Sequence, residues 1–386
     1  MTNIIFDIIY TLLAGILLLI ALPILLFASL KKKYKHSLLR RFFLIKNPSF
    51  DIYDIWFHVC SLGETKALAP LLERLQKYKI AISVTTQTGF YAAQQYRAQV
   101  RYLPYEIWLW FWIKSPRTIV VLEAEFWYLL FRIGTLRGGN VIALNARISE
   151  RSYPKYYKLR WFYKLLFKQC HHIFCQSEED KKRFLALGAK SVEVVGNIKL
   201  AQKVVQTKQY KKPNSLLIIA GSTHEGEEEG ILKAYLAYKK RVPDAILVMV
   251  PRHPERFDKV AELIEKQTFN LEFTRWSQQQ TFSKDITLID AMGELNNLYA
   301  VADIAILGGA FMPIGGHNPL EPATFGCKII TGNEIFLQKE LFKYVTNVQF
   351  VELNKLEQAL IMAENMRGSN INSTIDLERV VDYLKN

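Results

Sequence analysis

One long run of hydrophobic residues stands at the start of the chain. Residues 8–30 contain no charged side chain, whereas Asp7 precedes them and four lysines follow within residues 31–35. A stretch of about 20 apolar residues is enough to cross a bilayer as a helix. A signal peptide usually has a shorter apolar run with its positive charges in front of it. We therefore expect residues 1–33 to form an uncleaved membrane anchor.

The charges next to this run predict its orientation. Flanks that are rich in lysine and arginine tend to stay on the cytoplasmic side of a membrane. Residues from Lys31 onward are therefore expected in the cytoplasm, with a very short N-terminus outside. Pro23 lies inside the run and is able to break a helix, so a hairpin-like, monotopic insertion from one side is the alternative.

After this run, short strand-like segments alternate with helical patterns. The strand candidates are residues 55–59, 80–85, 118–122, 141–145, 172–175 and 192–195, and then residues 216–220, 245–250, 270–274, 286–289, 304–307, 328–331 and 349–351. Residues 201–214, between the two sets, are polar and basic and are expected to form a linker. Alternating strands and helices predict parallel sheets covered by helices. The expected fold is α/β with two Rossmann-like, doubly wound domains, residues 34–205 and 206–386, with a C-terminal helix able to pack back on the first domain.

The net charge of the 386-residue chain is +14, which favours nucleic acid, acidic lipids or phosphorylated substrates as partners. No motif of a nucleic-acid-binding module is present, so no nucleic acid is expected. Beside a membrane anchor, the charge favours the anionic membrane surface. Basic and aromatic residues are interleaved in residues 151–168, and a second aromatic cluster consists of Trp108, Trp110, Phe111 and Trp112. Both segments are typical of a membrane interface or of buried amphipathic helices with a solvated basic face.

The cysteines do not indicate a metal site. The four cysteines form no Cys-x-x-Cys pair, and the Cys-His-His-Ile-Phe-Cys segment at residues 170–175 overlaps a strand-like run and lacks zinc-site spacing. No Asp-x-Asp pair occurs, which argues against a nucleotide bound through Mg²⁺. We expect no metal, no cofactor and free thiols in a reducing cytosolic setting.

Carboxylates and a lysine follow strands of the first domain. Ser61 and Glu64 have the spacing of a capping box, so Glu64 is either a helix cap or a carboxylate that faces a ligand. Glu123 and Glu125 share a face if the chain is extended. Their repulsion would then raise one pKa and suit proton transfer; a surface ion pair or a metal site are the alternatives. Lys199, after the last strand, either reaches a charged ligand group or is solvated.

Loops after four strands of the second domain combine glycines with polar side chains. Gly pairs at residues 308–309 and 315–316 let backbone N–H groups approach a ligand, and a following helix points its positive end at a phosphate. Arg252 suits a phosphate or carboxylate, and Asn318 and Glu321 are able to hold sugar hydroxyls. This convergence predicts a nucleotide-type donor in the second domain and an acceptor that faces the first, as in a sugar transferase. The candidate binding residues are His224, Pro251, Arg252, Met292, Gly293, Glu294, Leu295, Asn318, Pro319, Leu320 and Glu321.

Eight segments taken together resemble the Kdo (3-deoxy-D-manno-octulosonic acid) transferases of Gram-negative bacteria. They are residues 58–64, 123–127, 144–147, 196–199, 222–227, 251–256, 292–295 and 315–322. The resemblance runs in order from the anchor to about residue 340. There are two departures: Tyr128 stands where the family usually has Pro, and Ala310 stands where it often has Ser.

The resemblance implies a GT-B fold and an inverting, metal-independent transfer of Kdo from CMP-Kdo to a lipid A precursor, lipid IVA. The reaction would take place at the inner membrane, with the catalytic domains on the cytoplasmic side. Glu64 would be the general base, and Glu125 and Lys199 would stabilise the transition state. The candidate residues of the second domain would bind CMP-Kdo, with His224 near its phosphate. Family members with the same motifs differ in the number of Kdo residues that they add.

Two other functions stay open from the residues. One is a GT-B lipid glycosyltransferase that uses a UDP-sugar, which labelled CMP- and UDP-sugars would distinguish. The other is a membrane-tethered scaffold that binds anionic lipid through its basic face. A scaffold has no need of polar loops at the ends of strands, and it would release no nucleotide.

Overall fold

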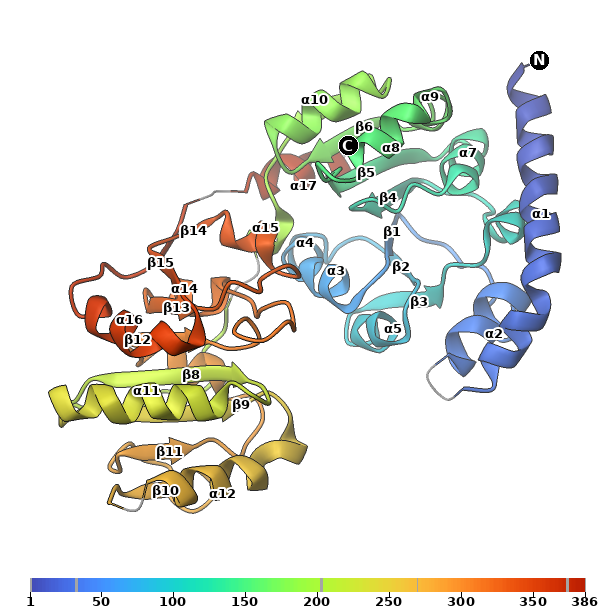
Figure 1. Cartoon of the computed structure of the whole chain (residues 1–386). Helices are drawn as coiled ribbons and strands as arrows, with labels where there is room; N and C mark the ends of the chain where they lie inside the picture. Colours follow the sequence, from blue (N-terminus) through green and yellow to red (C-terminus); the bar gives the residue numbers. More distant parts are fainter. Residues whose placement is uncertain (1, 32–33, 202–203, 269, 373–374, 386) are drawn as a thin grey trace. The chain divides into compact units, whose positions relative to one another are not determined.

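The computed structural model describes residues 2–31, 34–201, 204–268, 270–372 and 375–385. Two compact units make up the chain (Figure 1). Unit 1 comprises Met1–Lys203 and Thr374–Asn386, and unit 2 comprises Val204–Ser373.

Unit 1 is built on a parallel sheet of seven strands in the order β3-β2-β1-β4-β5-β6-β7. The chain order reverses between β1 and β4, which is the point where open α/β sheets bind ligands beyond their carboxyl ends. Six strands agree with the sequence prediction, whereas β3 was missed because this edge strand is polar and only partly buried. The strands are β1 Ile55–Val59, β2 Ile80–Val84, β3 Ala98–Tyr102, β4 Thr118–Leu122, β5 Asn140–Ala146, β6 His172–Cys175 and β7 Val192–Val194.

Helices cover both faces of this sheet and enclose two cores. On one face Trp56, Trp112 and Phe131 are buried together, and on the other Phe57 and Val380 are buried. Val380 belongs to the C-terminal helix, which packs in unit 1 (Figure 1). The helices are α1 Thr2–Ser29, α2 Lys35–Phe43, α3 Leu62–Ala67, α4 Ala69–Arg74, α5 Gln87–Ala93, η1 Glu106–Trp108, α6 Leu109–Trp112, α7 Tyr128–Leu136, α8 Tyr153–Lys158, α9 Arg160–Phe167, α10 Glu178–Ala186, η2 Ile198–Ala201 and α17 Leu377–Lys385.

The apolar run at the N-terminus forms helix α1. This helix is long and apolar enough to cross a membrane over Ile4–Ser29. It continues through Pro23, so the break that a hairpin would need is absent, whereas a monotopic insertion of the unbroken helix stays open. One side of α1 packs on the rest of unit 1, where Asp7, Ala14 and Leu18 are buried at intervals close to two turns and one turn of helix.

Unit 2 contains a second parallel sheet, with the order β10-β11-β9-β8-β12-β13-β15. All seven strands that the sequence predicts for this half are present. They are β8 Leu217–Thr223, β9 Ile246–Pro251, β10 Phe273–Arg275, β11 Ile286–Leu288, β12 Ile304–Leu307, β13 Lys328–Thr331 and β15 Val348–Phe350, and a small antiparallel pair adds β14 Val345–Thr346 and β16 Asn370–Ile371. The covering helices are α11 Glu228–Arg241, η3 Pro254–Arg256, α12 Phe257–Gln267, α13 Leu295–Tyr299, α14 Leu320–Thr324, α15 Lys339–Phe342, η4 Leu353–Lys355 and α16 Leu356–Ala363.

The described part of the expected linker is fastened to unit 2. The Asn297 carboxamide accepts hydrogen bonds from the backbone N–H groups of Thr207 and Lys208, at 2.8 and 3.1 Å. The Lys208 ammonium and the Tyr210 hydroxyl both bind the Glu294 carboxylate. Residues 207–210 are therefore held by side chains of unit 2.

Candidate active site

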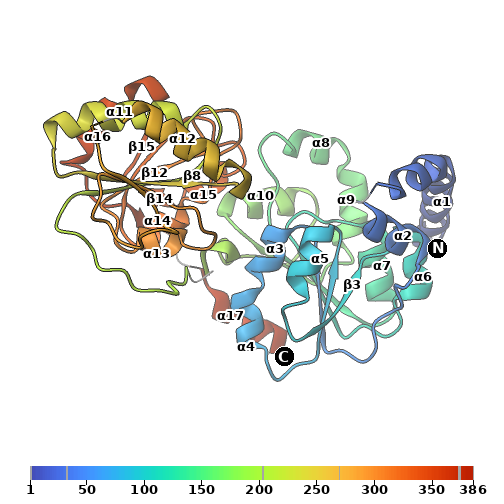
Figure 2. The same ribbon diagram turned by 90° about the horizontal axis from the view of Figure 1, so that it is seen from below.

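Glu64 lies just beyond the carboxyl end of β1, in the first turn of α3. Ser61 is the N-cap that the spacing predicts, since its hydroxyl accepts from the Glu64 backbone N–H at 3.4 Å, but the Glu64 carboxylate does not return to the Ser61 backbone N–H as a capping box would. The Glu64 carboxylate accepts from the Cys60 backbone N–H at 2.8 Å and from the Ser61 hydroxyl at 2.9 Å. Helix α3 lies beside α5 (Figure 2). Capping fixes the position of the carboxylate and does not exclude a chemical role.

The charge state of Glu64 differs from that of an ordinary glutamate. Only 7% of the residue is exposed. Burial raises the pKa of its carboxyl to about 7, and the negative charges of Glu123 and Glu125 add to the increase. The hydrogen bonds from Cys60 and Ser61 oppose the shift without cancelling it. A carboxylate with a pKa near neutrality is suited to accept a proton from a substrate hydroxyl.

Glu125 has the opposite shift. Burial would raise the pKa of its carboxyl, but His58 and the Trp127 indole lower it below its ordinary value. The indole N–H donates to Glu125 at 2.8 Å, and Nε2 of His58 lies 3.8 Å from the same carboxylate oxygen. Environments that separate the pKa values of neighbouring carboxyls commonly mark an acid–base site.

His58 is fully buried in β1 and faces this carboxylate from within the sheet. Its Nδ1 is hydrogen-bonded to the Ser83 hydroxyl at 2.9 Å, across the register of β1 and β2. Its Nε2 has no hydrogen-bond partner among the described residues. Buried imidazole nitrogens without a hydrogen-bond partner are uncommon in native proteins, so the place of this one beside a carboxylate points to a role in the site.

Glu123 pairs with cations and not with Glu125. Lys199 Nζ lies 2.7 Å from one of its oxygens, and Arg147 Nε lies 3.9 Å from the other. The prediction that Glu123 and Glu125 share a face is wrong, because it needs an extended chain and Glu123 has a φ of +54°. Lys199 is held nearby by Asn145, whose side chain accepts from the Ile198 backbone N–H at 3.0 Å.

In unit 2, the fully buried Glu227 joins the loops after β8 and β12. Its carboxylate accepts from the backbone N–H groups of His224, Gly309 and Phe311, at 2.9, 2.8 and 3.0 Å. Burial raises its pKa, although these three donors oppose the shift. One carboxylate therefore orders two of the loops that the sequence singles out.

Three histidines gather at these loop ends. Nε2 of His224 lies 2.9 Å from Nε2 of His317, and their rings stack at a centroid distance of 5.1 Å. The His253 ring is 5.3 Å from that of His224. Burial lowers the pKa of His317 to about 4, and positive charge on His224, Arg252 and His253 adds to the decrease. The positive charge of the neighbouring residues makes protonation of His317 unfavourable, and the same positive charge would attract an anion.

Other candidates of unit 2 make local contacts. The Asn318 carbonyl oxygen accepts from the Leu320 backbone N–H at 3.1 Å, and its amide donates to Glu321 at 3.3 Å. The Glu294 carboxylate is occupied by Lys208, Tyr210 and Asn297; these hydrogen bonds outweigh burial and lower its pKa. Its side chain therefore fastens residues 207–210, which removes it as a free ligand-binding carboxylate.

The remaining candidates follow their strands as expected. Pro251 is buried at the end of β9 and Arg252 is exposed next to it. Met292 is 59% exposed, and Gly293 has a φ of +87° with open space around it. Leu295 begins α13, and Pro319 and Leu320 stand at the start of α14.

Comparison with known proteins identifies the family of this chain. Residues 31–202 match the family model described as 3-deoxy-D-manno-octulosonic-acid transferase (kdotransferase). The chain is 33% identical over 375 residues to the 3-deoxy-D-manno-octulosonic acid transferase of Haemophilus influenzae, covering 89% of this chain and 87% of that protein. The chain belongs to the Kdo transferase family. It is therefore a glycosyltransferase.

A solved structure agrees with the fold of this Kdo transferase. The UDP-GlcNAc 2-epimerase of Neisseria meningitidis, bound to UDP-GlcNAc, matches with a TM-score of 0.56 at 13% identity, covering 86% of this chain and 100% of that chain. The C-terminal CMP-Kdo binding domain of WaaA from Acinetobacter baumannii is 28% identical, with a TM-score of 0.36, covering 45% of this chain and 88% of that domain. The likeness to the epimerase and the two seven-stranded sheets confirm the GT-B-like fold.

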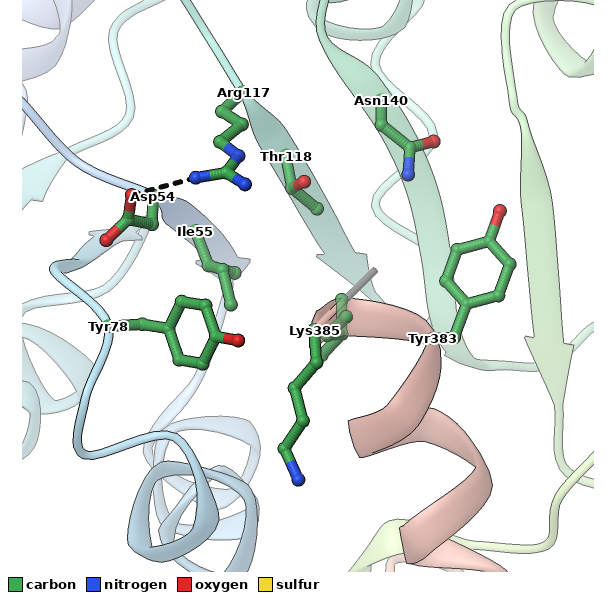
Figure 3. Close-up of a pocket in the computed structure, with 9 residues that line it drawn as sticks. Asp54, Ile55, Tyr78, Arg117, Thr118, Asn140, Tyr383 and Lys385 are labelled. Atoms are coloured by element: carbon green, nitrogen blue, oxygen red, sulfur yellow. Dashed lines mark hydrogen bonds and ion pairs between the residues drawn. The ribbon is translucent and has the colours of Figure 1, made fainter.

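A small hollow of about 150 Å³ lies at the opposite, amino end of the sheet of unit 1. It is lined by Asp54, Arg117, Asn140 and the C-terminal helix residues Tyr383 and Lys385 (Figure 3). Ligands of open α/β sheets bind at the carboxyl ends of strands, where Glu64 and Glu125 stand. The hollow is therefore not the active site of this Kdo transferase.

Sequence reasoning missed three residues of these sites: His58, Glu227 and His317. His58 and His317 lie inside segments that carry the family resemblance, but no role was attached to them. The sequence signal for Glu227 is its position three residues after His224. A carboxylate at this spacing commonly accepts a hydrogen bond from the earlier backbone N–H.

Proposed function

We propose that the chain transfers Kdo from CMP-Kdo to a lipid A precursor, lipid IVA, in the synthesis of the lipopolysaccharide core. The transfer inverts the anomeric centre and requires no metal. The observation that carries the proposal is the opposite charge preference of two neighbouring carboxyls, since the pKa of Glu64 is raised to about 7 and that of Glu125 is lowered.

Glu64 is the general base of this proposal. Its carboxylate takes the proton of the acceptor hydroxyl as the hydroxyl oxygen forms a bond to the anomeric carbon of Kdo. The bond between that carbon and the phosphate oxygen breaks, and CMP leaves with the electron pair. The raised pKa supports this role, because a base works best when its pKa is near the working pH.

Glu125 and Lys199 stabilise the charges that develop during transfer. The lowered pKa of Glu125 keeps its carboxylate negative at neutral pH, which favours positive charge on the sugar ring. Lys199 contributes a cation, but Glu123 at 2.7 Å compensates part of its charge. We therefore assign it a smaller electrostatic effect than that of a free ammonium.

Unit 2 binds the donor. Arg252 and His224 hold the phosphate of CMP-Kdo, and Asn318 and Glu321 hold hydroxyls of its ribose or sugar. Pro251, the Met292–Leu295 turn, to which Glu294 contributes its backbone, and the pair Pro319 and Leu320 shape the remaining contacts. Cationic side chains replace a metal in stabilising the departing phosphate. The histidine cluster supports this assignment, because a bound phosphate would favour the protonated form of imidazoles whose pKa burial and neighbouring cations lower.

The acceptor side lies at the inner membrane, with both units in the cytoplasm. The apolar helix α1 and the net charge of +14 support this location. A phosphorylated lipid is anionic, so a basic, membrane-bound protein concentrates it at its surface.

The test is to incubate the purified full-length chain with a tetraacylated lipid A precursor and labelled CMP-Kdo, and to identify the product by mass spectrometry. The expected product has the mass of the acceptor plus one or more Kdo residues, together with released CMP. Parallel incubations with UDP-sugars are the control. Transfer from a UDP-sugar alone would replace the donor assignment, and lipid binding without nucleotide release would favour a scaffold.

A further inference from the structure

Helix α1 presents a continuous apolar face away from unit 1. Six residues define this apolar face: Ile5, Ile9, Leu12, Ile16, Ile20 and Phe27. Each of them is between 50% and 71% exposed. Soluble surfaces rarely expose apolar patches of this extent, and such patches mark sites of interaction with a partner or a membrane.

The opposite side of α1 is bound to unit 1 by polar contacts near its N-terminus. Asp7 accepts from the Tyr128 hydroxyl at 2.7 Å and from Arg132 Nε at 2.9 Å. The Tyr10 hydroxyl donates to Glu106 at 2.7 Å. The side chains of Asp7 and Arg132 are only 7% and 11% exposed, so this is a buried ion pair.

Contacts continue toward the other end of the helix. The Tyr105 hydroxyl donates to the Ala14 carbonyl at 3.2 Å, and Leu18 is buried. Near the C-terminal end, Ser29 is buried, and α1 contacts α2 (Figure 1). The helix is therefore attached to unit 1 from its first turns to its last.

This attachment is incompatible with a helix that spans the bilayer. A helix of 28 residues is about 42 Å long, and the hydrocarbon core is about 30 Å thick. If α1 crossed the membrane, Asp7 and its partners on α7 would lie in hydrocarbon or on the far side. Arg132 and Tyr128 belong to the helix that covers the central sheet, so they cannot leave unit 1 without unfolding it.

We propose that α1 lies in the plane of the membrane, with its apolar face in the lipid and both its ends on the side of unit 1. This monotopic arrangement replaces the orientation that the flanking lysines predict, in which the N-terminus is outside. The inference rests on the membrane location proposed above, but not on the reaction.

Neighbouring side chains fit an anionic phospholipid surface. Phe111 is 77% exposed on α6, beside Trp110, whose indole donates to Thr11 of α1 at 3.2 Å. Trp161 is 57% exposed on α9 and contacts Phe6 of α1, with ring centroids 6.1 Å apart. Exposed basic residues accompany Trp161 in the same segment: Lys155, Lys158, Arg160 and Lys164. Aromatic rings at headgroup level with cations around them are typical of interfacial segments.

The orientation is tested with the full-length chain bound to the outside of sealed vesicles of phosphatidylethanolamine and phosphatidylglycerol. A protease-sensitive tag precedes Met1, and a matched tag follows Asn386 as the control. We expect a protease added outside to remove both tags at similar rates. An N-terminal tag that is protected until detergent is added would overturn the monotopic arrangement.

The apolar face is tested by vesicle sedimentation of the I9K/I20K variant. Two lysines on this face should weaken vesicle binding by about tenfold or more. The control is Ile52→Lys, at a position in unit 1 that is 78% exposed and outside α1; it should bind like the unmodified chain. Equal binding of I9K/I20K would overturn the assignment of the face.

Two further outcomes separate the proposals. If the unmodified chain does not bind vesicles at all, the membrane location fails, whatever the reaction is. If it instead forms a dimer that I9K/I20K disrupts in analytical ultracentrifugation, the apolar face is an interface between two copies and the inference is wrong.

Discussion

Breaking the buried ion pair between Asp7 and Arg132 should destabilise unit 1 strongly. The Asp7→Asn substitution removes one charge but keeps an oxygen that can accept from the Tyr128 hydroxyl. Removing one partner of a buried pair costs about 3–5 kcal/mol, because the other charge stays buried without compensation. With Arg132 only 11% exposed, we expect a loss of at least about 3 kcal/mol.

The assay is urea unfolding in mild detergent, followed by tryptophan fluorescence. Six of the seven tryptophans lie in unit 1, at residues 56, 108, 110, 112, 127 and 161, so the signal reports mainly on that unit. The matched control is Asp54→Asn in the same unit. Its partner Arg117 is 68% exposed and lies 3.3 Å away, so this change should cost under about 1 kcal/mol.

A difference between the two variants of less than about 1 kcal/mol would refute the reasoning. It would mean that Asp7 is solvated in solution and that the first turns of α1 are not bound to unit 1. The monotopic arrangement would then lose its main support.

Three other substitutions test the sites. His58→Phe removes the ring that lowers the pKa of Glu125, so the pKa of the Glu125 carboxyl, followed by NMR titration, should rise; an unchanged pKa would limit His58 to packing. Gly309→Ala should weaken CMP-Kdo binding about tenfold or more, because its Cβ would meet a histidine ring at 2.8 Å, whereas Gly326→Ala has a similar φ and open space and should bind normally. Arg252→Ala should raise the Kd for CMP-Kdo about tenfold or more in calorimetry, and an unchanged Kd would exclude it from the donor site.

Much of the fold can be predicted from the sequence because central parallel strands are buried on both faces. Such strands are continuous apolar runs, as in β1 and β8. The exception, β3, has the sequence Ala-Gln-Val-Arg-Tyr at the edge of its sheet. Its polar residues are tolerated because an edge strand stays partly solvated.

The candidate site could be predicted only in part, since its geometry depends on register and backbone conformation. His58 is held by Ser83 through the alignment of β1 with β2, which the sequence does not reveal. The left-handed φ of Glu123 breaks the expected pairing of two carboxylates. The sequence did, however, predict that Glu64, Arg252 and Asn318 follow the carboxyl ends of strands.

The orientation that we propose for α1 differs from the one that its flanking charges predict. An apolar run satisfies the same hydropathy rule whether lipid surrounds it or protein covers one side. The discriminating signal is the spacing of Asp7, Tyr10, Thr11 and Ala14, which places polar and small residues on one side of the helix. That stripe predicts a contact between one side of α1 and the rest of the protein.

The pH dependence of Kdo transfer, measured for the unmodified chain and for Glu64→Gln, tests the catalytic account most directly. Glu64 acts in its ionised form, so kcat/KM should rise as the pH increases through about 7, the value to which burial raises the pKa of its carboxyl. Glu64→Gln should lower kcat by about a hundredfold or more, since general base catalysis contributes on the order of 10²–10⁴-fold, while the Kd for CMP-Kdo stays unchanged. A Glu64→Gln variant with near-normal turnover, or the same rise near pH 7 in that variant, would contradict the account and leave Glu64 as a helix cap.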